Sequence, residues 1–191
     1  MCYGEPKMQY GKLKEDSEGL IERAEILKQW EVKDKFLLDL GAGPLAIIAA
    51  RDFNCTVTNI DISEGALSDA KRDAANEGVA GRIRFEKGDA TSLPYPNGCF
   101  EVVISYGVLH HIEIAKRRRF IQEACRVASD KIIVAELTLE GFQRIHAVSN
   151  FKAVDLEWLE TELKSFGEVD KYVGTLMKVY TLFLFTKENL C

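Results

Sequence analysis

The sequence predicts a single α/β domain built on a doubly wound, mostly parallel sheet. Short apolar runs alternate along the chain with segments of helical periodicity, which is the order that parallel β-α-β units produce. Gly41 and Gly43 follow the first apolar run, and a second apolar run ends at Asp61. A strand, a glycine turn that opens a helix, and an acid about 20 residues later together predict a nucleoside-binding unit.

The predicted strands are short runs rich in Val, Ile, Leu and Phe, bounded by turn residues. Those of the parallel part of the sheet lie at 35–40, about 55–60, around 83–85, 100–105 and 131–136. A turn-rich loop, Leu-Pro-Tyr-Pro-Asn-Gly at 93–98, precedes the fourth of them. Two final runs, at 168–173 and 178–186, predict a closing hairpin because Gly174 and Thr175 lie between them.

Helices are predicted where apolar residues recur at helical spacing between start and stop residues. The first segment, 18–30, places five apolar side chains on one face: Leu20, Ile21, Ala24, Leu27 and Trp30. Pro44 fits the first position of the next helix, which runs to about Asp52. Ser63 caps a helix with an alanine stripe that Gly78 ends.

Two further helices complete the alternation. A helix from about 114 to 128 is expected to bury Ile114, Ile121, Ala124 and Ala128. Asp155 caps a helix that presents Leu156, Leu159 and Leu163.

Length and charge fit one domain that does not bind polyanions. The 191 residues suffice for one substantial core. We divide them into an N-terminal segment and helix, 1–34, as a candidate lid, and a main domain, 35–191. The net charge of −5 gives no basic field, so a nucleic-acid partner is not expected. The run Lys116–Arg119 wraps around its helix, which favours a solvated surface over an RNA contact.

Cysteine usage predicts a reducing compartment. The five cysteines are scattered and form no C-x-x-C pair: Cys2, Cys55, Cys99, Cys125 and Cys191. Neither a disulfide framework nor a zinc site is expected, and the predicted location is cytoplasmic. The N-terminus lacks an apolar signal core and no apolar stretch is long enough to cross a membrane, so no membrane contact is expected. The oligomeric state is left open.

Asp39 indicates which nucleoside ligand the glycine turn suits. It lies inside the first apolar run, two positions before Gly41. A buried carboxylate is costly unless a positive charge pairs with it. A dinucleotide would bring a pyrophosphate that the acid repels, whereas S-adenosylmethionine brings a sulfonium and an ammonium. Asp39 therefore favours S-adenosylmethionine, and the alternative is a structural Asp39 that caps the turn.

Five sequence motifs carry a resemblance to a known family. The motifs that carry it are Asp39-Leu-Gly-Ala-Gly43, Asn59-Ile-Asp-Ile-Ser63, Lys87-Gly-Asp-Ala90, Phe100-Glu-Val-Val-Ile-Ser-Tyr-Gly-Val-Leu-His-His-Ile112 and Lys131-Ile-Ile-Val-Ala-Glu136. In this order and spacing they resemble the class I S-adenosylmethionine-dependent methyltransferases, in particular the branch that acts on small molecules. The chain departs from many members at Leu45, where a third glycine is common. The resemblance implies a Rossmann-like, seven-stranded sheet whose C-terminal strand is antiparallel.

The resemblance also implies how the cofactor is held. Asp61 would grip the ribose, Asp89 would accept from the adenine amino group, and the Ala90 backbone would complete base recognition. Ile62 would pack on the adenine, while the backbone at Gly41 and Ser105 would hold the methionine end. Gly43, which has no Cβ, lets the backbone approach the ligand. The alternatives are a turn role for Asp89 and an ordinary core position for Ile62.

His110 and His111 are the candidate catalytic residues. Imidazole titrates near neutral pH, and the pair follows the fourth strand. A base is needed only if the acceptor atom carries a proton, and neighbouring residues point in different directions, so one of the two is expected to face the cofactor. The alternative is a pair that lines the pocket without catalysis. A metal site is not expected, because no carboxylate or cysteine set lies near at ligand spacing.

Acceptor choice is assigned to the least patterned segments. These are Tyr3 to Tyr10 and the connection from Leu137 to Val154, which holds Phe142, Arg144, His146 and Phe151. The connection from Leu137 to Val154 is too short to form a separate substrate domain, which predicts a small-molecule methyl acceptor or an acceptor that stays partly exposed. The sequence does not identify the reactive atom of the acceptor.

Two other functions remain open. Gly41, Gly43 and Ala46 also fit a dinucleotide pattern, which leaves an NAD-dependent oxidoreductase as an alternative. The other is a relative that binds S-adenosylmethionine without turnover.

Overall fold

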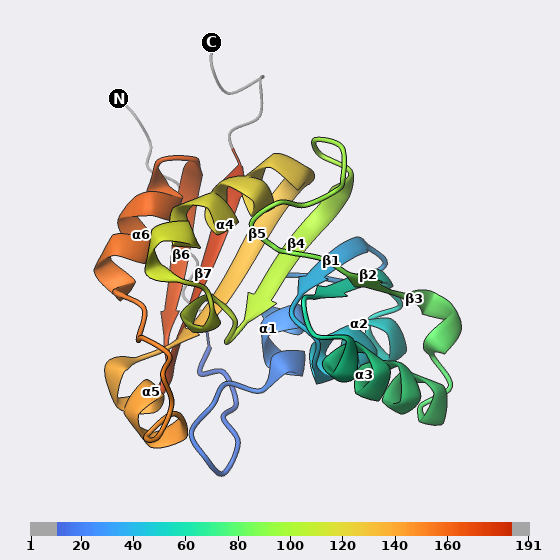
Figure 1. The fold of residues 1–191 in the computed structure, drawn as a ribbon, viewed down its shortest axis with the longest axis horizontal. Coiled ribbons are helices and arrows are strands. Elements are labelled where there is room, and N and C mark those ends of the chain that lie inside the picture. Colours follow the sequence, from blue (N-terminus) through green and yellow to red (C-terminus); the bar gives the residue numbers. More distant parts are fainter. Residues whose placement is uncertain (1–10, 185–191) are drawn as a thin grey trace.

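The computed structural model describes residues 11–184, which form one seven-stranded sheet flanked by helices (Figure 1). The strands are β1 (Phe36–Leu40), β2 (Thr56–Asp61), β3 (Ile83–Lys87), β4 (Phe100–Tyr106), β5 (Ala128–Leu137), β6 (Gly167–Val173) and β7 (Met177–Leu184). They lie in the order β3-β2-β1-β4-β5-β7-β6. β1 to β5 are parallel, and β7 pairs antiparallel with both β5 and β6. The predicted Rossmann-like sheet with an antiparallel last strand is confirmed.

Six α-helices and two short 3-10 turns connect the described strands. The helices are α1 (Arg23–Gln29), α2 (Pro44–Asp52), α3 (Glu64–Asn76), α4 (Ile114–Val127), α5 (Leu139–Ile145) and α6 (Leu156–Lys164). The 3-10 turns are Ala80–Arg82 and Leu109–His111. Two predicted caps are confirmed: the Ser63 hydroxyl accepts a hydrogen bond from the Ala66 N–H, and the Asp155 carboxylate accepts from the first turn of α6.

Side-chain alternation along the strands divides the core into two layers. Leu37 of β1 packs with residues of α1 and α2 on one face, while its neighbours Leu38 and Leu40 pack with residues of α4 and α6 on the other. Figure 1 shows α4 and α6 in front of the sheet. A sheet buried on both faces explains why the parallel strands are near-continuous apolar runs.

The strand order also fixes where a ligand can enter. The chain winds outward from β1 through β2 to β3 and then returns to place β4 on the other side of β1. The connections leaving the carboxyl ends of β1 and β4 therefore diverge, and a crevice opens between them.

Three sequence predictions need correction. The first helix begins at Arg23 and not at residue 18, because Gly19 adopts a left-handed conformation (φ 87°) and the Asp16 carboxylate accepts from the Glu18 and Leu20 N–H groups in a turn. Ile114 was expected in the core but is 67% exposed, since it begins α4 at the helix end that leaves the sheet.

The third correction concerns the connection 137–154, which contains the unpredicted helix α5. Thr138 caps it by accepting from the Gly141 N–H. Gly141 lies so close to the Leu176 carbonyl that no Cβ would fit there, and this contact docks α5 beyond the carboxyl end of β5 (Figure 1). The other segment expected to choose the acceptor, Tyr3 to Tyr10, lies outside the described residues.

The basic run on α4 has one buried member. Lys116, Arg118 and Arg119 are exposed, as predicted, but Arg117 is buried. Its guanidinium donates to the carbonyl oxygens of Ile112, Ala153 and Lys152. Arg117 therefore holds the end of the 137–154 connection against α4. Within residues 11–184, no helix is both long and apolar enough to cross a membrane.

Candidate functional site

A cleft of about 650 Å³ lies at the carboxyl ends of the first four strands. It is lined by the residues that follow β1, β2, β3 and β4, together with Arg23 of α1 and Phe151 of the 137–154 connection. Most of the residues predicted to bind the cofactor line it: Asp39, Gly41, Gly43, Asp61, Ile62, Asp89 and Ala90. The fold thus brings together Asp39 and Asp89, which lie 50 positions apart in the sequence.

The two glycines of the turn play different parts. Gly41 has a φ of 99°, and a Cβ there would lie 2.5 Å from the Val108 Cγ2, so the turn itself requires glycine. Gly43 has extended backbone, and a Cβ there would meet no atom of the described protein within 4 Å. Gly43 therefore keeps open a space in the cleft that the protein does not fill.

Asp61 connects the glycine turn to the end of β2. Its Oδ2 accepts a hydrogen bond from the Ala42 N–H at 2.7 Å, and its Oδ1 accepts from the Ser63 N–H at 2.7 Å. Each carboxylate oxygen has two lone pairs, so both oxygens keep acceptor capacity toward the cleft while the backbone bonds fix the side chain.

Asp39 lies on the face of β1 that α1 and α2 cover, and it is buried. Burial raises the pKa of the Asp39 carboxyl well above its usual range, and the Arg23 charge, the Ala46 N–H and the Asn59 amide oppose that rise. The Asn59 Nδ2 donates to the Asp39 Oδ2 at 3.1 Å. Arg23 therefore supplies part of the positive charge that a buried Asp39 carboxylate requires. The sequence did not predict this role of Arg23.

Arg23 is held in the cleft wall by Tyr106. The guanidinium carbon lies 4.0 Å from the centre of the Tyr106 ring, a cation–π contact. The Tyr106 hydroxyl donates to the Ile21 carbonyl at 2.8 Å. The start of α1 is thus fastened over the end of β4. Periodicity along the N-terminal segment gives no signal for this contact, because its partner lies 83 positions away.

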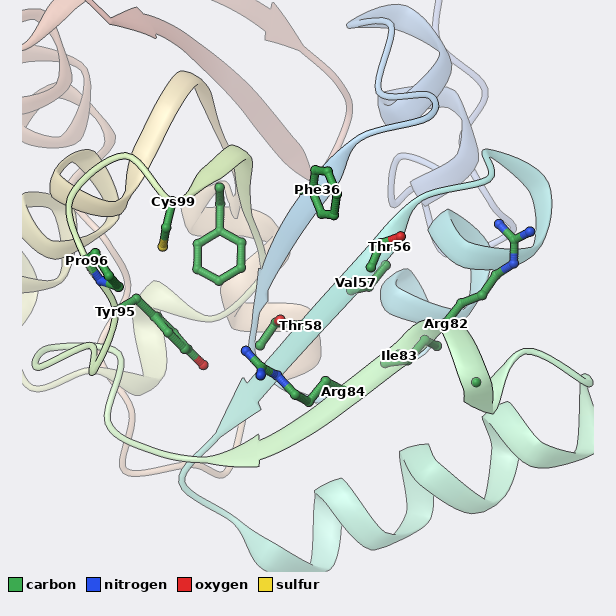
Figure 2. Close-up of a pocket in the computed structure, with 12 residues that line it drawn as sticks. Phe36, Thr56, Val57, Thr58, Arg82, Ile83, Arg84, Tyr95, Pro96 and Cys99 are labelled. Atoms are coloured by element: carbon green, nitrogen blue, oxygen red, sulfur yellow. The ribbon is translucent and has the colours of Figure 1, made fainter.

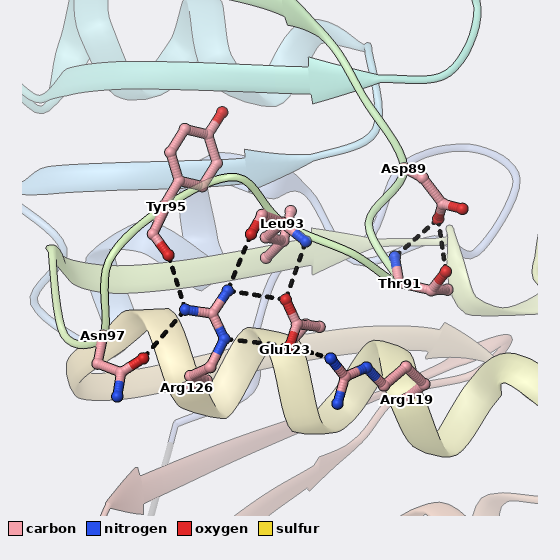
Figure 3. Close-up of polar contacts among 8 residues, drawn as sticks. All are labelled: Asp89, Thr91, Leu93, Tyr95, Asn97, Arg119, Glu123 and Arg126. Carbon is pink, nitrogen blue, oxygen red and sulfur yellow. Dashed lines mark hydrogen bonds and ion pairs between the residues drawn. The ribbon is translucent and has the colours of Figure 1, made fainter.

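Asp89, Ala90 and Ile62 lie at the β2–β3 end of the cleft. The Asp89 Oδ1 accepts from the Thr91 N–H and hydroxyl at 2.8 and 2.7 Å (Figure 3), and these two bonds lower the pKa of the Asp89 carboxyl. Both bonds use Oδ1, which leaves Oδ2 for a ligand. Ile62 is 71% exposed, so it does not occupy the core position that the alternative assigned to it.

An ion-pair network fixes the loop after Asp89. Arg126 of α4 donates to the carbonyls of Leu93 and Tyr95 and pairs with Glu123, which also accepts from the Leu93 N–H (Figure 3). The loop carrying Asp89 and Thr91 is therefore tied to the rigid helix α4.

Ser105 does not line the cleft. Its side chain is buried, and its hydroxyl has no hydrogen-bond partner among residues 11–184. Its neighbours Tyr106 and Gly107 line the cleft instead. The predicted contact through the Ser105 backbone stays a prediction.

The two candidate catalytic histidines differ in surroundings. His111 is exposed and lines the cleft near Phe151, with ring centres 4.2 Å apart. Burial lowers the pKa of His111, and the neighbouring His110 and His146 lower it further. His110 is buried, with its Nδ1 2.7 Å from the Glu136 Oε1. His146, at the end of α5, lies 4.6 Å from His110 between ring centres.

A second cavity, of about 510 Å³, lies at the opposite end of the sheet. Figure 2 shows Phe36, Thr56 and Ile83, at the amino ends of β1, β2 and β3, with Tyr95 and Pro96 on the loop across the cavity. None of the predicted site residues lines this cavity. The predicted site residues that line a cavity are therefore those at the carboxyl ends of the strands.

Comparison with known proteins identifies a family. Residues 37–131 match the family model described as "Methyltransferase domain". The ajmaline N-methyltransferase of Rauvolfia serpentina is 32% identical over 101 residues, which cover 52% of this chain and 34% of that enzyme. The chain thus spans about a third of the length of this curated relative.

Two solved structures are similar across most of the chain. The PH0226 protein of Pyrococcus horikoshii OT3 has a TM-score of 0.72 at 20% identity, covering 84% of this chain and 86% of its own. The magnesium protoporphyrin IX methyltransferase of Synechocystis PCC 6803, solved with bound SAH, has a TM-score of 0.67 at 17% identity, covering 85% and 80%. At these identities the likeness shows the fold.

Proposed function

We propose that this chain transfers methyl groups. The premise is that it belongs to the class I S-adenosylmethionine-dependent methyltransferases, through its methyltransferase domain at residues 37–131. The chain would bind S-adenosylmethionine in the 650 Å³ cleft and transfer its methyl group to a small organic acceptor. The observation that supports this most is the pair of carboxylates, Asp61 and Asp89, fixed at the ends of adjacent strands beside the open space at Gly43.

The residues present fit this cofactor. Asp61 is positioned by two backbone N–H groups to accept from ribose hydroxyls, and the Asp89 Oδ2 is available to accept from the adenine amino group. The exposed Ile62 offers an apolar surface to the adenine ring. Asp39 favours a cation beside the glycine turn, since a nearby positive charge stabilises its ionised form.

Catalysis would depend on placing the acceptor in line with the methyl group. S-adenosylmethionine supplies an electrophilic methyl group, so no covalent enzyme intermediate is needed. Positioning alone can contribute roughly 7–11 kcal/mol to lowering the barrier. Where the acceptor atom carries a proton, a ring nitrogen of His111 would take it, because His111 lines the cleft and its lowered pKa keeps the ring neutral near pH 7.

The acceptor would enter at the His111 end of the cleft. Phe151 lines this end, and Arg117 holds the two residues after it. The relatives named for ajmaline and for magnesium protoporphyrin IX support an organic small molecule as acceptor. Cys55, Cys99 and Cys125 are free thiols, which supports the predicted cytoplasmic setting.

Ligand binding is the first test of this proposal. In thermal-shift and calorimetric titrations of the full chain, S-adenosylmethionine and S-adenosylhomocysteine are expected to raise the melting temperature, because both would bind the folded state alone. NAD and NADH are expected to leave it unchanged. Binding of NAD in place of both sulfur-bearing nucleosides would overturn the proposal and favour the oxidoreductase.

Turnover is tested with a radiolabelled methyl group and pools of small organic acceptors, with an RNA pool as the negative control. If the acceptor loses a proton, His111→Ala is expected to lower kcat by about 10²–10⁴-fold, the usual contribution of a general base, while S-adenosylmethionine affinity is kept. Unchanged kcat in this variant would exclude His111 as the base. A chain that binds S-adenosylmethionine but labels no acceptor would match the non-catalytic alternative.

A further inference from the structure

All histidines of this chain gather in one place. The sequence contains three, and the fold brings His146, at the end of α5, against the adjacent pair His110 and His111 that follows β4. The ring centre of His110 lies 4.3 Å from that of His111 and 4.6 Å from that of His146. The ring centres of His111 and His146 are 5.5 Å apart. One nitrogen of each ring lies within 4.8 Å of the other two.

The orientation of the His110 ring is fixed by Glu136. The two side chains are 3% and 1% exposed, and the His110 Nδ1 lies 2.7 Å from the Glu136 Oε1. Glu136 is itself held, because its Oε1 accepts from the Leu137 N–H and its Oε2 from the His110 N–H. In the neutral tautomer that donates to the Glu136 carboxylate, Nδ1 carries the hydrogen and Nε2 presents a lone pair.

That lone pair is unpartnered. The His110 Nε2 is buried and makes no hydrogen bond within residues 11–184. A buried polar atom left without a partner is costly. A histidine that donates one N–H to a carboxylate, and that lies in a cluster with two further imidazoles whose ligand nitrogens are all within 4.8 Å of one another, has the arrangement found around metal-binding histidines.

We propose that His110, His111 and His146 bind a divalent transition-metal ion such as Zn²⁺, with Glu136 as a positioning residue. Imidazole suits Zn, Cu, Fe and Ni, and three protein ligands leave a fourth position open, as in catalytic zinc sites. His111 also lines the cleft, so this open position lies beside the place where the acceptor would enter. A metal-bound His111 has no free lone pair, so the role of general base proposed for His111 applies to the metal-free chain. The metal site goes beyond the proposed function, because binding of S-adenosylmethionine does not require it.

This site differs from the sequence prediction, which expected no metal site. His110 and His111 alone lack ligand spacing, and the third ring lies 35 positions beyond His111, across α4, β5 and α5. Zn–N bonds are about 2.0–2.1 Å long, so the farthest pair of nitrogens must draw together on binding. His146, partly exposed at the end of a helix, is the ring best able to move.

The test is a metal titration of the full chain after treatment with a chelator. Co²⁺ is followed by its visible absorption, and Zn²⁺ by calorimetry. One ion per chain is expected, with the absorption of imidazole-bound Co²⁺ and without a thiolate charge-transfer band. Both His146→Ala and the size-preserving His146→Gln are expected to lose stoichiometric binding. Glu136→Gln is expected to weaken affinity about 10–100-fold, the usual cost of losing such a partner.

Cys99→Ser is the matched control, since it removes an exposed thiol outside the histidine cluster and should bind the metal like the parent chain. Failure of the parent chain to bind Zn²⁺ or Co²⁺ stoichiometrically would overturn the proposal, as would undiminished binding by both His146 variants. Binding of S-adenosylmethionine is measured on the same samples to separate the two proposals. If the parent chain binds S-adenosylmethionine but no metal, the metal site is rejected and the proposed methyl-transfer function is not.

Discussion

Replacing Asp61 with Ala is expected to lower the affinity for S-adenosylmethionine by at least about a hundredfold. Hydrogen bonds to a charged group contribute about 1.5–3 kcal/mol each. Two such bonds to ribose hydroxyls would therefore change the dissociation constant by about two to four factors of ten. The variant also loses the two backbone bonds that Asp61 makes to Ala42 and Ser63, so a lower melting temperature without ligand is expected as well. Calorimetric titration measures the affinity.

Asp69→Ala is the matched control for this variant. Asp69 is an exposed carboxylate on α3 that pairs with Arg72 and does not line the cleft, so its loss should leave the affinity unchanged. A folded Asp61→Ala chain that binds S-adenosylmethionine as tightly as the parent would refute the ribose-binding role of Asp61 and, with it, the proposed orientation of the cofactor.

The second large effect is a contrast between the two glycines of the turn. Gly43→Ala is expected to fold with the stability of the parent chain, because its Cβ meets no protein atom, yet to bind S-adenosylmethionine roughly tenfold or more weakly, since overpacking costs about 1–3 kcal/mol. Gly41→Ala is expected to be unstable without any ligand, because it combines a φ of 99° with contact to Val108. Its backbone strain alone costs about 1–3 kcal/mol.

Thermal melts and calorimetry on the two variants separate these effects. At roughly 2–4 °C per kcal/mol for a chain of this size, Gly41→Ala should melt several degrees below the parent, whereas Gly43→Ala should melt with it. Equal affinity of the Gly43→Ala and parent chains for S-adenosylmethionine would show that no ligand approaches this position closely.

The features that could be predicted from the sequence are those that depend on residues close together in the chain. The apolar runs, the Ser63 and Asp155 caps and the turn at Gly41 each depend on a few consecutive positions, and the structure confirms them. The cofactor carboxylates could be predicted as a group because the carboxyl ends of parallel strands share one edge of the sheet. Their chemical roles remain predictions.

The features that the sequence did not predict depend on distant partners. Arg23 faces the cleft because Asp39 and Tyr106 lie beneath the start of α1. His146 reaches His110 because α5 docks where Gly141 meets Leu176. Arg117 is buried because three carbonyl oxygens converge on it. No periodicity or motif within a single segment reports such contacts, since each is decided by how the segments pack.

The anchoring of α1 has a consequence for how ligands exchange. Ile21, Ile26 and Leu27 are fully buried, and exposing each costs about 1.5–3 kcal/mol beyond the Tyr106–Ile21 hydrogen bond. Swinging this helix aside would thus be a rare event in the resting protein. Under the proposed function, cofactor and product would therefore enter and leave past the exposed side chains of Ile62 and Phe151, while α1 stays in place.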